Sequence, residues 1–192
     1  MKRHYCLCAV LAALLALACT ANAAEKEAPK PPRVGDQMVD FTLKDLGGRK
    51  IPTAKARGRI LVLKFGATWC GWCTKAIPEL NKVKAAYPKT VVVLDVNIRE
   101  DAKTVRAHNR KHRATYITLL DTTGAVANRY GVSGIPVVMV IDTDGKIVFS
   151  GYYTPFETLR KTIDPLVKEM EDRAKAAAEE ARRKETDEAV GE

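Results

Sequence analysis

The sequence predicts an α/β domain in which helices cover both faces of a mixed central β-sheet. Apolar, β-branched segments alternate along the chain with segments of helical period, and parallel strands need helical crossovers of this kind. The last two apolar segments are instead joined by DTDG (142–145), a tight turn that connects antiparallel strands. Both kinds of strand pairing are therefore expected in one sheet.

The strands are predicted from apolar runs that are bounded by polar residues. A short N-terminal hairpin comes first, with VDFTL (39–43) and RKI (49–51) on either side of Gly47-Gly48. The later strands are expected in the core of the sheet, and they are RILVLKF (59–65), TVVVLDVN (90–97), YITLLD (116–121), PVVMVID (136–142) and KIVFSG (146–151). The chain shows no internal repeat, so these segments are expected to build a single domain.

Helices are predicted between the strands. The first runs from Cys70 to about Tyr87, because its apolar residues recur on one side and Pro88 stops it. The others are a polar helix over 101–112, a short helix over 124–130 and a last helix over 155–170.

Composition divides the chain into four parts. Residues 1–23 are predicted to be a secretory signal peptide, because Lys2 and Arg3 precede an apolar run and ANA (21–23) forms a small-residue cleavage site. The remaining parts are expected to be a Pro- and Lys-rich linker (24–33), the folded domain (34–170) and a charged C-terminal tail (171–192) that forms a solvated or fraying helix.

The leader predicts an extracytoplasmic, periplasmic location. Two alternatives keep the protein at the membrane. The leader could stay uncut, since its uncharged run is long enough to span a bilayer. The protein could also be a lipoprotein attached through Cys19, although the preceding ALA lacks the expected leucine.

The net charge of +9 falls to +7 if Lys2 and Arg3 leave with the leader. The basic residues are spread along the chain without an RNA-binding aromatic motif, so no nucleic-acid partner is expected.

The cysteine pattern favours chemistry over structural cross-linking. Of five cysteines, Cys6, Cys8 and Cys19 lie in the leader, which leaves Cys70 and Cys73 in the mature chain. A bridge between residues so close restricts the unfolded chain little. Structural zinc usually needs four ligands, and haem attachment needs a histidine directly after the second cysteine, where this chain has a threonine. No metal or haem is therefore expected, and redox exchange remains.

Two histidines, His108 and His112, are four residues apart and so share one face of the polar helix. We interpret them as surface residues, with a metal-ligand role as the alternative.

Cys70 is placed at the junction between a strand and the start of a helix. Free backbone N–H groups and the positive end of the helix dipole stabilise a thiolate there, and the thiolate is the nucleophile. Cys73 follows one helical turn later, within reach of Cys70. The pair therefore predicts a cycle in which Cys70 attacks a substrate disulfide and Cys73 resolves the mixed disulfide.

The motifs around this pair resemble those of the thioredoxin superfamily. They are TWCGWC (68–73), AIPEL (76–80) and YGVSGIPVVMVIDTDGKIV (130–148). The N-terminal VGDQMVDFTLKDLGGRKI (34–51) and YITLLDTTGAVANRYGV (116–132) are similar to segments of its secreted TlpA/ResA-like branch. The resemblance covers residues 34–170 and implies a thioredoxin fold with an N-terminal hairpin and a strand–helix insertion.

The resemblance also implies roles for residues near the dithiol. Pro78 would kink the first helix, and Pro136 would be a cis-proline beside the cysteines. A cis-Pro136 would turn the Ile135 backbone outward to pair with an extended substrate segment. The alternative for Ile135 and Pro136 is an ordinary strand start. The residues expected to contact substrate are Trp69, Gly71, Trp72, Ile135 and Pro136.

Two positions depart from the family pattern. Trp72 replaces a usual proline, and its ring either contacts substrate or shields Cys73. Lys64 stands where thioredoxins have a buried acid that moves a proton for the resolving thiol, and the family's alternative glutamate position holds Ala76. Lys64 either lowers the pKa of the thiols by favouring their thiolate forms or extends to solvent, and we favour the second interpretation.

Glu79 and Glu100 are acids that could serve the thiols, but no feature of the sequence places either of them near a cysteine sulfur.

The resemblance implies an extracytoplasmic protein-disulfide reductase with no cofactor besides its own disulfide. Its substrates would be protein disulfides, including those of apocytochrome c, and a membrane electron donor of the DsbD/CcdA type would recharge it. The alternatives are a thiol oxidase or isomerase and a non-catalytic client-binding module. Peroxiredoxin relatives share the hairpin, but their P-x-x-x-T-x-x-C motif is absent from this sequence.

Overall fold

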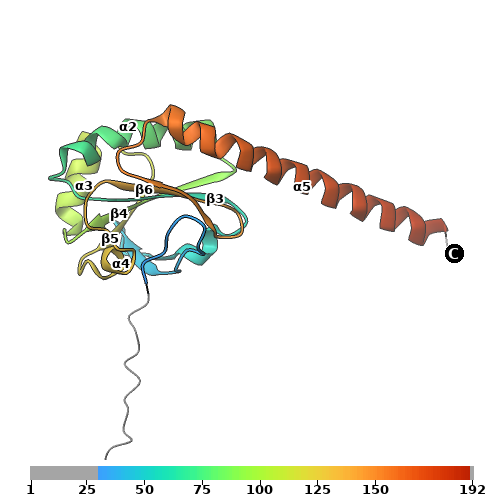
Figure 1. The fold of residues 1–192 in the computed structure, drawn as a ribbon, viewed down its shortest axis with the longest axis horizontal. Coiled ribbons are helices and arrows are strands. Elements are labelled where there is room, and N and C mark those ends of the chain that lie inside the picture. Colours follow the sequence, from blue (N-terminus) through green and yellow to red (C-terminus); the bar gives the residue numbers. More distant parts are fainter. Residues whose placement is uncertain (1–29, 191–192) are drawn as a thin grey trace, which may run out of the picture.

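The computed structural model describes residues 30–190, so the predicted signal peptide and most of the predicted linker lie outside the described residues. Its centre is a seven-stranded mixed sheet with strand order β2-β1-β5-β4-β3-β6-β7. Helices lie on both sides of this sheet (Figure 1), as predicted. The sequence-based fold class is therefore confirmed.

The strands fall close to the predicted runs. They are β1 (Thr42–Asp45), β2 (Lys50–Pro52), β3 (Ile60–Gly66), β4 (Val91–Ile98), β5 (Ile117–Asp121), β6 (Val137–Ile141) and β7 (Ile147–Gly151). The central strands β3, β4 and β5 are parallel neighbours, whereas β6 pairs antiparallel with β3 and β7 antiparallel with β6. The predicted hairpin forms from β1 and β2, and β1 joins the sheet antiparallel to β5.

The helices also match their predicted segments. They are α2 (Gly71–Ala86), α3 (Ala102–Lys111), α4 (Ala125–Arg129) and α5 (Phe156–Val190). A short 3-10 helix, η1 (Thr53–Ala56), follows β2 and was not predicted, because four residues are too few to show a period. Within residues 30–190, no helix combines the length and the apolar character needed to cross a bilayer.

Two apolar clusters hold the layers together. One packs α2 and α5 on the sheet through fully buried side chains, among them Ile77, Leu80 and Val83 of α2 and Leu159 and Ile163 of α5. The other lies on the opposite face, under α4 and the N-terminal segment. Burial of such side chains contributes about 1.5–3 kcal/mol each before the loss of conformational entropy.

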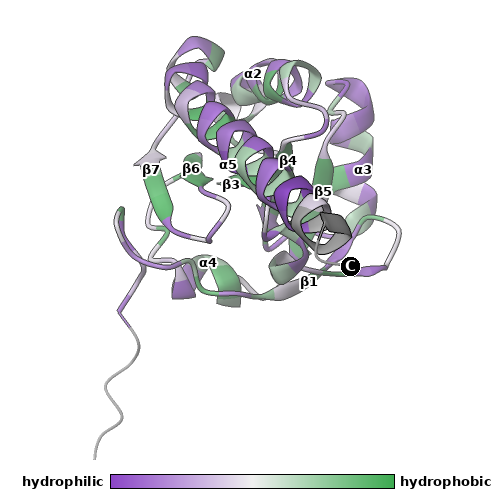
Figure 2. Ribbon diagram, turned by 90° about the vertical axis from the view of Figure 1, so that its right-hand side faces the viewer, coloured by the Kyte–Doolittle hydropathy of each residue, from purple (hydrophilic) through white to green (hydrophobic). Residues whose placement is uncertain are grey.

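Helix α5 begins against the body of the domain and then leaves it (Figure 1). The Glu79 carboxylate of α2 accepts the backbone N–H of Phe156 at 2.7 Å, which satisfies one of the free N–H groups at the start of α5. After Met170 the described side chains are exposed. Figure 2 colours most of this part hydrophilic, in agreement with a solvated helix that adds nothing to the core.

Candidate redox site at the start of helix α2

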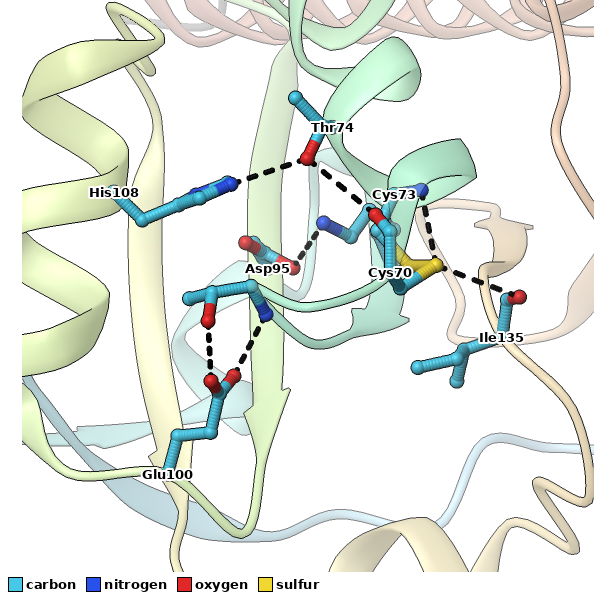
Figure 3. The surroundings of a disulfide bond; sticks show 9 residues. Cys70, Cys73, Thr74, Asp95, Glu100, His108 and Ile135 are labelled. Atoms are coloured by element: carbon cyan, nitrogen blue, oxygen red, sulfur yellow. Dashed lines mark hydrogen bonds and ion pairs between the residues drawn. A yellow bond between two sulfur atoms is a disulfide. The ribbon is translucent and has the colours of Figure 1, made fainter.

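Cys70 and Cys73 form a disulfide at the start of α2, directly after the buried strand β3 (Figure 3). Cys70 is the N-cap of the helix, and its Sγ accepts the backbone N–H of Cys73 at 3.1 Å. Cys70 is 8% exposed and Cys73 only 1%. Cys70 is therefore the sulfur that another molecule reaches first, and Cys73 lies behind it.

The loop before β6 lies against this disulfide. The peptide bond between Ile135 and Pro136 is cis, the geometry that the family resemblance implies. The carbonyl oxygen of Ile135 lies 3.7 Å from Cys70 Sγ (Figure 3). An extended chain that pairs with the Ile135 backbone would therefore be brought next to Cys70.

Exposed aromatic rings accompany the cysteines. The Trp69 side chain is 75% exposed and that of Trp72 is 56% exposed. The Trp72 ring packs on Tyr153 with 5.3 Å between ring centroids, and Lys75 Nζ lies 4.2 Å from its centroid. Exposed apolar rings at a disulfide are typical of a contact surface for another molecule.

Lys64 does not extend to solvent, so that interpretation was wrong. It is 4% exposed, and its Nζ forms an ion pair with Asp95 Oδ1 at 2.9 Å (Figure 3). The two residues are directly opposite each other in the parallel β3–β4 pair. A charged partner on the neighbouring strand is what keeps this ammonium inside the protein.

Gly66 makes room for the lysine beside the resolving cysteine. A Cβ atom at Gly66 would lie 3.0 Å from Lys64 Nζ and 3.1 Å from Cys73 Sγ. Because both atoms lie so close to the same point, they are no more than about 6 Å apart. A larger residue at position 66 would force the end of the Lys64 side chain or the Cys73 sulfur to shift.

Glu100 holds the loop that precedes Cys70. Its carboxylate accepts the Thr68 backbone N–H at 2.7 Å and also the Thr68 hydroxyl (Figure 3). Glu79, the other acid considered from the sequence, instead caps α5 and pairs with Lys82. These contacts, together with burial, set the pKa of Glu79: burial raises it, but the hydrogen bonds from Phe156 and Lys82 leave it below its usual value.

His108 is only partly a surface residue. Its Nε2 contacts the Thr74 hydroxyl at 3.1 Å, and that hydroxyl donates to the Cys70 carbonyl at 3.4 Å. Burial and the neighbouring His112 lower the pKa of His108, so its ring is neutral near pH 7. Among residues 30–190, no group of three or more His, Cys, Asp or Glu side chains is arranged to hold a metal.

Sequence reasoning missed Asp95, Thr68 and Tyr153. Asp95 carried a signal, because it is a lone charge inside the apolar run TVVVLDVN. A charge inside a buried strand needs a partner, and Lys64 is the other lone charge in such a run. Thr68 and Tyr153 had no comparable signal.

A mixed sheet with helices on both faces, a C-x-x-C disulfide at a helix start and a cis-proline beside it place this chain in the thioredoxin class. The chain belongs to the AhpC/TSA family, whose model matches residues 34–150.

Comparison with known proteins agrees with this assignment. The chain is 34% identical over 115 residues to the thiol-disulfide oxidoreductase ResA of Geobacillus thermodenitrificans, covering 59% of this chain and 66% of that protein. It is also 34% identical over 116 residues to the thioredoxin-like protein YneN of Bacillus subtilis, covering 59% of this chain and 68% of the relative. The chain thus spans about two thirds of the length of these relatives.

A solved structure is similar as well. It is a secreted disulfide oxidoreductase of Mycobacterium tuberculosis that is homologous to DsbE of E. coli. It superposes with a TM-score of 0.60 at 25% identity, over 66% of this chain and 96% of that one.

Proposed function

We propose that this protein is a thiol–disulfide oxidoreductase that reduces disulfides in other proteins through its Cys70–Cys73 pair. The observation that carries the proposal is the arrangement of the two sulfurs. The more accessible Cys70 caps α2 beside the Ile135 carbonyl, and Cys73 is buried directly behind it. One sulfur is thus placed to attack and the other to resolve.

The proposed cycle starts from the dithiol. The Cys70 thiolate attacks one sulfur of a substrate disulfide, the substrate S–S bond breaks, and the released substrate thiolate takes up a proton. Cys73 then loses its proton and attacks Cys70 Sγ. The mixed disulfide breaks, the second substrate thiol leaves, and Cys70–Cys73 becomes a disulfide that has given two electrons to the substrate.

The start of α2 makes Cys70 the nucleophile. Its sulfur accepts the backbone N–H of Cys73 and lies at the positive end of a helix of 16 residues. Both effects stabilise a thiolate, so we expect the pKa of the Cys70 thiol to lie below that of free cysteine when the bridge is open.

The substrate would bind as an extended segment across the Ile135–Pro136 loop. Its backbone would pair with Ile135, and its side chains would contact Trp69, Gly71 and Trp72. The exposure of the two tryptophan rings supports this arrangement.

We place the protein outside the cytoplasm, after removal of the leader, as the similar Mycobacterium tuberculosis protein is secreted. A reductase in that compartment must be recharged. A membrane electron donor of the DsbD/CcdA type would restore the dithiol, and apocytochrome c is the proposed substrate class by likeness to the TlpA/ResA branch.

One observation favours a second function. The buried Lys64 lies near Cys73, and a cation there stabilises thiolates and so weakens the reducing power of the pair. The protein would then act as an oxidase or isomerase. A reduction potential well above that of thioredoxin supports this alternative, and a value near thioredoxin supports the reductase.

A trapping experiment tests the proposed function. We expect the full exported protein with Cys73→Ser to accumulate covalent complexes with its substrates, because the mixed disulfide on Cys70 can no longer be resolved. The complexes are separated on non-reducing gels and identified by mass spectrometry. The Cys70→Ser/Cys73→Ser variant is the matched control and should trap nothing. A Cys73→Ser protein that traps no more than this control would contradict the proposal.

A further inference from the structure

The Lys64–Asp95 pair is buried directly behind the resolving cysteine. Lys64 is 4% exposed and Asp95 is also 4% exposed, so neither charge is solvated as a surface charge would be. The ion pair joins β3 to β4, and Gly66 leaves the space through which the ammonium approaches Cys73 Sγ to within about 6 Å. Burying two charges is costly, and a hydrophobic pair at the same positions is often as stable or more so.

The charge next to the Cys73 sulfur is the positive charge of the Lys64 ammonium group. Of the two partners, Lys64 is the one whose Nζ shares the space at Gly66 with Cys73. Other ionisable groups surround the pair from the neighbouring elements. Burial and the nearby Asp95 raise the pKa of Tyr116, which therefore stays neutral. On α3, burial lowers the pKa of His108, and the Lys64 charge lowers it further.

Glu100 acts on His108 as well, and its carboxylate accepts hydrogen bonds from Thr68. Lys64 is the group whose charge the geometry at Gly66 brings next to the Cys73 sulfur. A buried ammonium at this distance favours the ionised form of a neighbouring thiol.

We propose that Lys64, held in place by Asp95, stabilises the Cys73 thiolate in the step in which Cys73 resolves the mixed disulfide. This inference rests on the proposed function and deepens it. In that step the Cys73 thiol gives its proton to solvent, and its sulfur attacks Cys70 Sγ. The bond from Cys70 to the substrate sulfur breaks, and the substrate leaves as a thiolate that takes up a proton.

Lys64 takes part in none of the bonds that form or break in this step and acts through the charge of Cys73, so it is a positioning residue. It sets the fraction of Cys73 that is ionised near neutral pH. A structural role alone would leave the pH dependence of the resolving step unchanged.

The test follows resolution directly with an aromatic disulfide reagent that releases a coloured thiolate. The reduced protein reacts first at Cys70, and the second release of colour reports the attack of Cys73. The main variant is Lys64→Met/Asp95→Asn, which removes both charges and leaves neither one buried alone. Lys64→Met is the second variant, and Lys82→Met, which removes an exposed cation of α2, is the control.

In the double variant we expect the midpoint of the pH profile for the second colour release to rise by about one pH unit. A charge within about 6 Å shifts the pKa of a neighbouring group by about 1–3 units, and the opposite charge of Asp95 offsets part of the effect of Lys64. At pH values below the midpoints of both proteins, the double variant has about tenfold less Cys73 thiolate than the wild type, but each thiolate is more reactive because it is more basic. The rate of the second colour release should therefore be about threefold lower in the double variant at these pH values. Above both midpoints Cys73 is fully ionised in both proteins, so the more basic thiolate of the double variant should react about threefold faster. Lys64→Met should shift in the same direction.

A double variant whose pH profile matches the wild type and Lys82→Met would overturn the proposal. Insulin-disulfide reduction is measured in parallel. If neither the wild type nor the variants reduce insulin but the pH profile of the second colour release still shifts, the proposed function fails and the role of Lys64 stands. If insulin is reduced and the profile does not shift, the role of Lys64 fails alone.

Discussion

Replacing Cys70 by serine is expected to reduce the rate of insulin-disulfide reduction to that of dithiothreitol alone. A serine hydroxyl is not ionised near neutral pH, so the helix start has no nucleophilic anion to stabilise, and no mixed disulfide can form. The remaining Cys73 cannot substitute, because it is 1% exposed and lies behind position 70. The measurement is insulin precipitation followed by turbidity.

The fold should survive this change, since one oxygen replaces one sulfur at the start of α2. Thermal unfolding followed by circular dichroism checks this point under reducing conditions, with the reduced wild type for comparison. The exposed Lys82→Met variant serves as the activity control and should reduce insulin like the wild type. A Cys70→Ser protein that is folded and still accelerates insulin reduction would show that Cys70 is not the nucleophile.

Lys64→Met is expected to lower the free energy of unfolding by about 3–5 kcal/mol, because it leaves the Asp95 carboxylate buried without its partner. Adding Asp95→Asn should recover most of this loss, since the double variant buries no unpaired charge. Urea unfolding at neutral pH measures both variants, and the shift of the midpoint at constant slope gives the change in stability.

The exposed ion pair of Arg160 with Glu157 provides the matched control. Both of its side chains are more than half exposed, so Arg160→Met should change stability by less than about 0.5 kcal/mol. If Lys64→Met and the double variant unfold at the same urea concentration, the two buried charges are not energetically coupled, and the account of this pair is wrong.

The arrangement of strands and helices could be predicted from the sequence because its signals are local. β3 is buried along its whole length, and its continuous apolar run shows this without reference to any other segment. The turn before β7 is equally local: Asp142 Oδ1 accepts the backbone N–H groups of Asp144 and Lys146, and Gly145 has a φ of 91° that favours glycine.

The sequence could not show the environment of residues that depend on a distant segment. Lys64 seemed able to reach solvent because its partner, Asp95, lies 31 positions later and meets it only through the β3–β4 register. His108 looked like a surface residue because its contact, Thr74, belongs to a different helix.

The cis bond at Pro136 was implied by family resemblance alone, as the residues themselves also fitted an ordinary strand start.

The redox equilibrium of the purified protein shows whether Cys70 and Cys73 exchange between dithiol and disulfide. The protein is incubated in a series of buffers with increasing ratios of reduced to oxidised glutathione, and its free thiols are then alkylated and counted by mass spectrometry. We expect Cys70 and Cys73 to change state together in one reversible two-electron transition. Two sulfurs that stay joined or stay free across the whole series, or that react independently of each other, would contradict this expectation.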